Sequence, residues 1–130
     1  MMKNSTKKIG DIGESYAADY LTKHRYKIKE RNYRKRYGEI DIIAEKNGII
    51  AFVEVKTRHS NTLAQPFEAV DRRKQEKIIK TAINYIYENK LDCNCRFDVC
   101  EVFVDKDSLK LQKINYYENA FMMESDYGYY

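Results

Sequence analysis

The chain has 130 residues and a mass of 15.5 kDa, a length that suits one domain and excludes a two-domain enzyme. Hydrophobic residues make up 43% of it, which is enough to build a folded core. The mean hydropathy of −0.75 and the lack of about 20 consecutive apolar residues argue against a membrane protein. No apolar segment follows Met1, and the three cysteines are an odd number. We therefore expect a cytoplasmic location.

The net charge of +4 is unevenly distributed. Residues 1–38 carry 11 lysines and arginines against 4 acids, whereas residues 98–130 carry 3 against 7. Eight of the cations fall within residues 23–36, interleaved with Tyr26 and Tyr33. A basic stripe with aromatic residues suits a polyanion such as DNA or RNA. A solvated surface of an ordinary protein has the same composition, so charge alone does not decide between the two.

The first half of the chain predicts a helix followed by strands. Apolar residues at helical spacing predict a helix over residues 6–24, behind a cap at Ser5 or Thr6. Gly10 and Gly13 weaken this helix, so we expect another segment to approach it closely there. Strands are expected at residues 25–33, about 38–45 and about 49–57.

The second half predicts a long helix and two more strands. Pro66 precedes a helix over residues 67–89, whose inward-facing residues are expected to be Phe67, Val70, Ile78, Ile79, Ala82, Ile83 and Ile86. Strands at 96–104 and 109–117 flank a turn at 105–108, and a short helix follows at 118–123. The order α-β-β-β-α-β-β predicts a mixed α/β domain over residues 1–123, with a flexible tail at 124–130.

The hairpin around Asn47-Gly48 holds the candidate chemistry. Both residues tolerate the positive φ of a type I′ turn, which would pair Lys46 with Ile49. Continued along the strands, this register places Asp41 opposite Glu54 and Glu39 opposite Lys56. One face of the hairpin is then polar, with Glu39, Asp41, Glu54 and Lys56. The other is apolar, with Ile40, Ile42, Val53 and Val55.

The polar face suits metal-assisted hydrolysis of a phosphodiester bond. Two carboxylates opposed across strands repel each other, and a divalent cation such as Mg²⁺ or Mn²⁺ between them removes the repulsion. Lys56 then lies where its ammonium can stabilise the charge that develops on a phosphate. Two alternatives stay open. The hairpin can be a surface element with ordinary ion pairs, and a one-residue bulge would break the register.

The same residues carry a family resemblance. Asp41, followed by Glu54-Val55-Lys56, resembles the D…(D/E)-x-K signature of the restriction-endonuclease-like nucleases, and most closely the bacterial YraN family. The short motif occurs by chance, so the resemblance depends on an ordered set of segments along most of the chain. That set is Gly10-x-x-Gly13-Glu14, Arg31-Asn32-Tyr33-Arg34, Gly38-Glu39-Ile40-Asp41, Phe52 to Arg58, Pro66, Glu68-Ala69-Val70, Lys74, Arg96-Phe97-Asp98 and Asn119-Ala120-Phe121.

The resemblance implies a mixed central sheet flanked by helices and a metal-dependent nuclease site. Within that site, Asp41 and Glu54 would bind Mg²⁺ or Mn²⁺ together with the backbone carbonyl of Val55, and Lys56 would be catalytic. Similarity to archaeal Holliday-junction resolvases adds Glu14 from the first helix. Family membership does not establish turnover, because some relatives of this fold bind nucleic acid without cutting it.

Four further cations are candidates for nucleic-acid contacts. Arg34, Arg36 and Arg58 flank the open end of the hairpin, and Lys74 belongs to a basic cluster at the start of the long helix, where cations oppose the helix dipole. We expect a nuclease that acts on DNA, selects branched or damaged structures, and acts as a monomer or a homodimer. A non-catalytic nucleic-acid-binding module and a protein-interaction domain are the alternatives.

Overall fold

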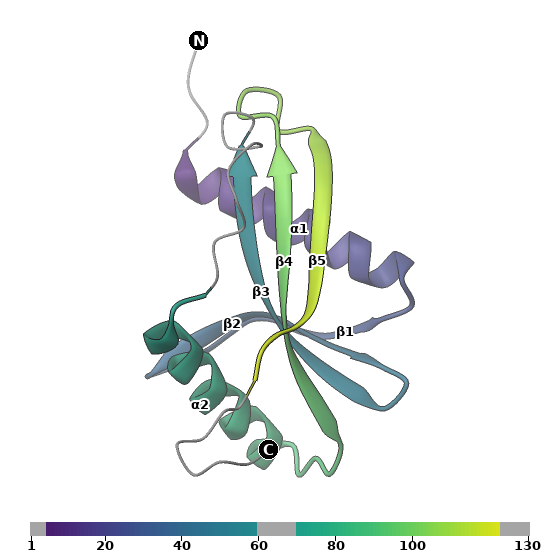
Figure 1. Cartoon of the computed structure of the whole chain (residues 1–130), viewed down its shortest axis with the longest axis vertical. Coiled ribbons are helices and arrows are strands. Elements are labelled where there is room, and N and C mark those ends of the chain that lie inside the picture. Colours follow the sequence, from purple (N-terminus) through teal and green to yellow (C-terminus); the bar gives the residue numbers. More distant parts are fainter. Residues whose placement is uncertain (1–4, 60–69, 123–130) are drawn as a thin grey trace.

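The computed structural model describes residues 5–59 and 70–122, and these follow the predicted order of elements (Figure 1). The elements are α1 (Thr6–Lys23), β1 (Lys27–Lys35), β2 (Gly38–Lys46), β3 (Ile49–His59), α2 (Arg72–Glu88), β4 (Asn94–Val104) and β5 (Leu111–Phe121). The mixed α/β class and the order α-β-β-β-α-β-β are confirmed. Among the described residues, no helix is both long and apolar enough to cross a membrane.

The strands form one sheet in the order β1-β2-β3-β4-β5. Neighbouring strands are antiparallel except β3 and β4, which run parallel over their whole length. A parallel pair needs a long connection, and α2 lies in the chain between these two strands. The sheet is strongly twisted: Figure 1 shows the upper parts of β3, β4 and β5 side by side, with β1 and β2 crossing below them.

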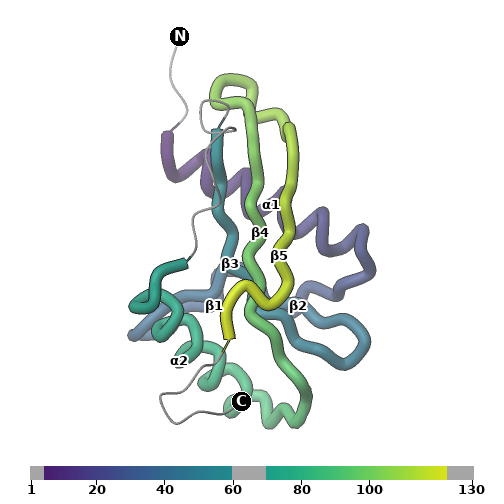
Figure 2. The backbone as a smooth tube through the Cα atoms, in the orientation of Figure 1, coloured from purple at the N-terminus to yellow at the C-terminus, as the bar shows by residue number. Residues whose placement is uncertain are grey.

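One helix covers each face of the sheet. Ala17 and Leu21 of α1 are fully buried against a cluster that includes Val53. On the opposite face, Ile78 of α2 packs with Phe52 in a second apolar cluster. The end of β5 bends toward α2 (Figure 2), which brings Phe121 into the second cluster.

The turn and the register of the central hairpin are confirmed. Asn47 has φ 52° and Gly48 has φ 77°, as a type I′ turn requires. β2 pairs with β3 from Lys46–Ile49 to Ile42–Val53, in the predicted register.

Beyond Ile42–Val53 the predicted hairpin is wrong. β2 leaves β3 and continues along β1, so Glu39 does not pair with Lys56. Ile40, expected beside Ile42, packs instead on the α2 face. The change of face coincides with Asn32 on β1, which has φ 53° and lies between the register pairs Arg31–Ile42 and Tyr33–Ile40. This left-handed residue changes which face the following side chains take.

Three expectations about the second half need correction. α2 begins at Arg72 rather than residue 67, because Asp71 accepts a hydrogen bond from Lys74 N and caps the helix. Ile83, expected to face inward, is 50% exposed. Residues 118–121 extend β5 rather than forming a helix. Phe67, residue 123 and the tail at 124–130 lie outside the described residues.

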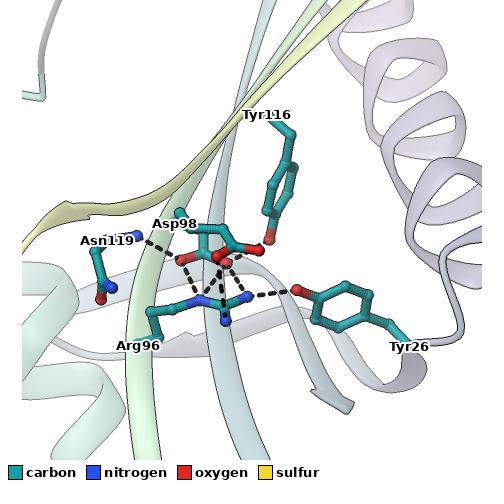
Figure 3. A network of polar contacts seen from close by, with 6 residues as sticks. Tyr26, Arg96, Asp98, Tyr116 and Asn119 are labelled. Atoms are coloured by element: carbon teal, nitrogen blue, oxygen red, sulfur yellow. Dashed lines mark hydrogen bonds and ion pairs between the residues drawn. The ribbon is translucent and has the colours of Figure 1, made fainter.

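A buried ion pair in the first half of β4 links this strand to β5 and to the residue before β1. Asp98, which is fully buried in β4, accepts hydrogen bonds from Arg96 Nε (2.9 Å), Tyr116 Oη (2.5 Å) and Asn119 N (3.0 Å) (Figure 3). Arg96 also donates to Tyr26 Oη, just before β1. The network therefore fixes the bulged part of β4 to the bend in β5 and to the start of β1.

Candidate functional site

A cavity of about 830 Å³ opens where β2 separates from β3. Its walls come from the first half of α1, the start of β2, the second half of β3 and the first half of α2. Six of the charged residues that line it are Glu14, Glu39, Asp41, Glu54, Lys74 and Lys77; Thr6, Thr57, His59 and, from the turn after β4, Lys106 and Asp107 complete its polar lining. Four of these six had been predicted as site residues, and they reach the cavity from four different elements.

Two carboxylates lie together at the separation of the strands. Asp41 Oδ2 accepts a hydrogen bond from Val55 N (2.8 Å), so a side chain of β2 takes the place of a backbone partner. Glu54, only 6% exposed, is the neighbouring acid on β3. Burial and the negative charge of Glu54 raise the pKa of Asp41 from its ordinary 3.8 to about 8, although the Val55 N–H opposes the shift. This pair therefore needs a proton or a cation between its members.

Lys74 supplies a positive charge to the pair. Its Nζ forms an ion pair with Glu54 Oε2, while half of the lysine side chain stays exposed to solvent. Partial burial lowers the pKa of Lys74, but the hydrogen bond and charge of Glu54, with a further contribution from Asp41, outweigh it and raise the pKa overall. Lys74 was predicted to contact phosphate, and in the structure its ammonium contacts Glu54.

A second pair of acids lies on the α1 side of the cavity. With its amide nitrogen turned toward them, Asn32 donates to Glu14 Oε1 (3.0 Å) and to Glu39 Oε1 (3.2 Å). Burial raises the pKa of Glu14, the charge of Glu39 adds to the increase, and Arg31 opposes it. Glu14 thus lines the same cavity as Asp41, as the sequence predicted, but in a separate hydrogen-bonded group.

Gly13 determines how closely α1 approaches the site. A Cβ placed on Gly13 would lie 1.9 Å from Thr57 Oγ1, so no larger residue fits without movement. This contact holds Glu14, the next residue of α1, beside β3. Gly10 has no heavy atom within 4 Å of its ideal Cβ, so the close approach expected at both glycines exists only at Gly13.

Lys56 follows Glu54 by two residues on β3, but it is not among the residues that line the cavity. It is half-buried and is paired in register with Glu101 of β4. Within the described part of the chain, its ammonium makes neither a hydrogen bond nor an ion pair. Glu101 is 3% exposed and accepts instead from Arg58 Nε (3.3 Å). The protein therefore neutralises Glu101 with Arg58 and leaves the Lys56 ammonium available.

The predicted arginines have different surroundings. Arg34 donates through Nε (3.0 Å) and Nη2 (2.8 Å) to Glu39 Oε2, at the edge of the cavity. Arg36 is exposed in the turn between β1 and β2. Arg58 is held by the buried Glu101. Two of these three arginines are therefore bound by acids of the protein.

Three residues of the site were missed at the level of sequence. Asn32 had a detectable signal, because asparagine is unfavourable within a strand and tolerates a positive φ. Lys77 belongs to the same basic cluster as Lys74, and its place in the cavity follows from its position one turn after Lys74. Nothing in the sequence indicated that Glu101 binds Arg58, since this contact depends on the register of β4 beside β3.

The donor set of Asp41 and Glu54 fits one divalent ion. Carboxylate oxygens are the ligands that Mg²⁺ and Mn²⁺ prefer, and a cation between the two acids would remove the repulsion that raises the pKa of Asp41. Within residues 5–59 and 70–122, no three His, Cys, Asp or Glu side chains converge on one point. Backbone carbonyl and water ligands would have to complete the coordination, an arrangement common for Mg²⁺.

These features define a mixed α/β protein with an acidic cavity between two helices, rimmed by lysines. The chain belongs to the uncharacterised protein family UPF0102, whose model matches residues 13–102. It is 46% identical over 122 residues to a UPF0102 protein of Caldanaerobacter subterraneus, covering 93% of this chain and all of that relative. A UPF0102 protein of Trichlorobacter lovleyi is 49% identical over 115 residues, covering 87% and 89% of the two chains. The matched region includes Asp41, Glu54, Lys56 and Lys74.

Proposed function

We propose that this protein is a Mg²⁺- or Mn²⁺-dependent nuclease that hydrolyses phosphodiester bonds in DNA. The observation that carries the proposal is the Asp41–Glu54 carboxylate pair, with Lys56 two residues after Glu54 on β3 and without an ion-pair partner among the described residues. The D…E-x-K arrangement of these residues resembles that of the restriction-endonuclease-like nucleases and of the YraN family. Membership of that superfamily is part of the same proposal.

Each residue has a distinct task in this proposal. Asp41 and Glu54 hold the divalent ion, with the Val55 carbonyl as a further ligand, and the Val55 N–H keeps the Asp41 carboxylate oriented. The bound ion supplies Lewis-acid activation of water and neutralisation of phosphate charge. Lys56 provides a second cation for the charge that develops on the reacting phosphate. Glu14 lines the cavity from α1 and helps to orient water there.

The test is cleavage of end-labelled DNA by the wild type, Asp41→Ala and Lys56→Met, with Mg²⁺, Mn²⁺ or EDTA. Single-stranded, duplex, flap and four-way junction DNA would be compared in parallel. We expect metal-dependent products from the wild type and none from Asp41→Ala. Lys56→Met should cut about 10²–10³-fold more slowly, the usual cost of losing one group that stabilises the transition state.

Calorimetric titration with Mn²⁺ separates the roles of these residues. Asp41→Ala should lose ion binding, whereas Lys56→Met should keep it. Lys46→Met, on the same hairpin but beside Tyr26 and far along β2 from the site, is the control and should cut like the wild type. Intact DNA in every lane with shifted bands would replace the proposal with a non-catalytic binding module. Equal cleavage by wild type and Asp41→Ala would overturn the assignment of the site.

A further inference from the structure

We propose that the Lys74 ammonium is the resident counter-cation of the Asp41–Glu54 pair, and that a divalent ion binds by displacing it. The inference rests on the proposed function, because it concerns the same carboxylates. It assigns Lys74 as a positioning residue that competes with the ion and is then released at the rim of the cavity.

The contact with Glu54 is the first observation behind this assignment. Glu54 is 6% exposed, and a buried carboxylate is costly unless a cation accompanies it. The Lys74 ammonium meets this need through Glu54 Oε2, an oxygen that the proposed ion would also use. The ammonium and a divalent ion would approach the same carboxylate with like charge, so each opposes the binding of the other.

The second observation is that the lysine side chain is free to leave while its backbone is fixed. Lys74 N donates to Asp71 Oδ1 (2.9 Å), and Gln75 Nε2 donates to the carbonyl of the buried Val70 (2.7 Å). The first turn of α2 is thus anchored. The Lys74 side chain itself is 50% exposed, so a rotamer change carries its ammonium into water without breaking other contacts.

Competition has a quantitative consequence. When only a fraction of the protein molecules has a vacant site, the apparent affinity for the ligand is reduced by that fraction. Lys74 must therefore weaken the binding of the divalent ion. Once displaced, its ammonium lies beside Lys77 at the rim, where it can contact a phosphate of a bound polyanion.

The experiment is calorimetric titration of the wild type, Lys74→Met and Lys77→Met with Mn²⁺. Lys77 is the matched control, because it lies one turn further along α2 and lines the same cavity but has no ion pair with Glu54. We expect Lys74→Met to bind Mn²⁺ roughly fivefold more tightly than the wild type, the effect of removing one partly exposed ion pair. Lys77→Met should show only the smaller gain that follows from loss of a nearby charge.

Thermal unfolding supplies an independent measurement. In EDTA, Lys74→Met should melt below the wild type, since Glu54 has lost its counter-cation. Saturating Mn²⁺ should close this difference, because an ion that binds only the folded state stabilises it. Lys77→Met should melt like the wild type in both conditions. Lys74→Gln replaces Lys74→Met if the latter does not fold.

The outcomes distinguish this inference from the proposed function. If neither the wild type nor Lys74→Met binds Mn²⁺, the metal site itself is refuted. If the wild type binds Mn²⁺ and the two lysine variants match each other, the site stands and the displacement of Lys74 is refuted. Tighter binding by Lys74→Met alone, together with its instability in EDTA, supports the displacement.

Discussion

Asp41 and Glu54 illustrate the cost of two neighbouring acids at the edge of a core. Glu54 is held by the pairing of β3 with β4, Asp41 by its hydrogen bond to the β3 backbone, and Lys74 neutralises only Glu54 through a direct contact. Asp41 receives one N–H from Val55, which offsets part of its burial. The remaining electrostatic cost exists only in the folded state, because in the unfolded chain water solvates both acids separately.

This electrostatic cost should make the free energy of unfolding depend on pH. The folded pKa of Asp41 is about 8, against 3.8 ordinarily, so between these values the folded protein retains a proton that the unfolded chain releases. Without divalent ions, the free energy of unfolding should therefore fall as pH rises from about 4 to about 8. The contribution of one proton is at most about 1.4 kcal/mol per pH unit.

Urea unfolding in EDTA at several pH values measures this slope. Asp41→Asn should reduce it markedly and leave the smaller contribution of Glu14, whose pKa is also raised. Asp11→Asn is a suitable control, because Asp11 is an exposed partner of Lys7 on α1. The same slope in the wild type and Asp41→Asn would show that the carboxylate pair does not carry the effect.

At the scale of elements, local patterns were predictable and contacts between elements were not. Asn47-Gly48 and the alternation around it determine the register of β2 and β3 through neighbouring residues, so that register was predicted correctly. The separation of the strands after Ile42–Val53 occurs where β1 carries the left-handed Asn32, one strand away. No pattern within the hairpin reveals it.

The residues of the site also differ in how far the sequence predicts them. Asp41, Glu54 and Lys56 lie on one hairpin, so spacing and resemblance to a known motif were enough to select them. Lys74 reaches Glu54 from a helix, and the basic cluster alone favoured a contact with phosphate instead. Its actual partner follows only from how α2 packs on the sheet.

The packing of α1 on β3 gives a prediction with an internal control. Gly13→Ala forces a Cβ onto Thr57 and should cost about 1–3 kcal/mol in the free energy of unfolding, as overpacking usually does. Gly10→Ala, in the same helix, meets no atom within 4 Å and should be neutral or stabilise the protein by up to about 1 kcal/mol. Urea denaturation of both variants gives the comparison.

A second substitution identifies the cause of the loss. Thr57→Ala removes the two side-chain atoms nearest to the ideal Cβ of Gly13, at 1.9 and 2.8 Å, and leaves the Thr57 Cβ at 2.9 Å. Combining Gly13→Ala with Thr57→Ala should therefore restore part of the stability relative to Gly13→Ala alone. Strictly additive losses would indicate that the two residues do not interact.

At the scale of the whole molecule, the Asp98 network joins parts that are distant in sequence. It connects Tyr26, just before β1, with Arg96 on β4 and with Tyr116 on β5 (Figure 3). Burial and the charge of Asp98 also raise the pKa of the Tyr116 hydroxyl, which keeps it a hydrogen-bond donor. Asp98 is paired in register with Val53, directly before Glu54, but no residue of the network lines the cavity, so the effects of the two on stability and function can be separated.

Asp98→Asn should destabilise the whole fold while leaving the carboxylate site intact. The Arg96 side chain is 14% exposed, and loss of its buried partner leaves an uncompensated charge that costs about 3–5 kcal/mol. Glu118→Gln removes an exposed partner of the same arginine, because Glu118 Oε1 lies 3.8 Å from Arg96 Nη1 and the Glu118 side chain is 60% exposed. That variant should lose less than about 1 kcal/mol. Equal losses of unfolding free energy in urea for the two variants would mean that burial does not set the strength of an ion pair with Arg96. A large loss confined to Asp98→Asn, with unchanged Mn²⁺ affinity, would establish that the network stabilises the fold independently of the site.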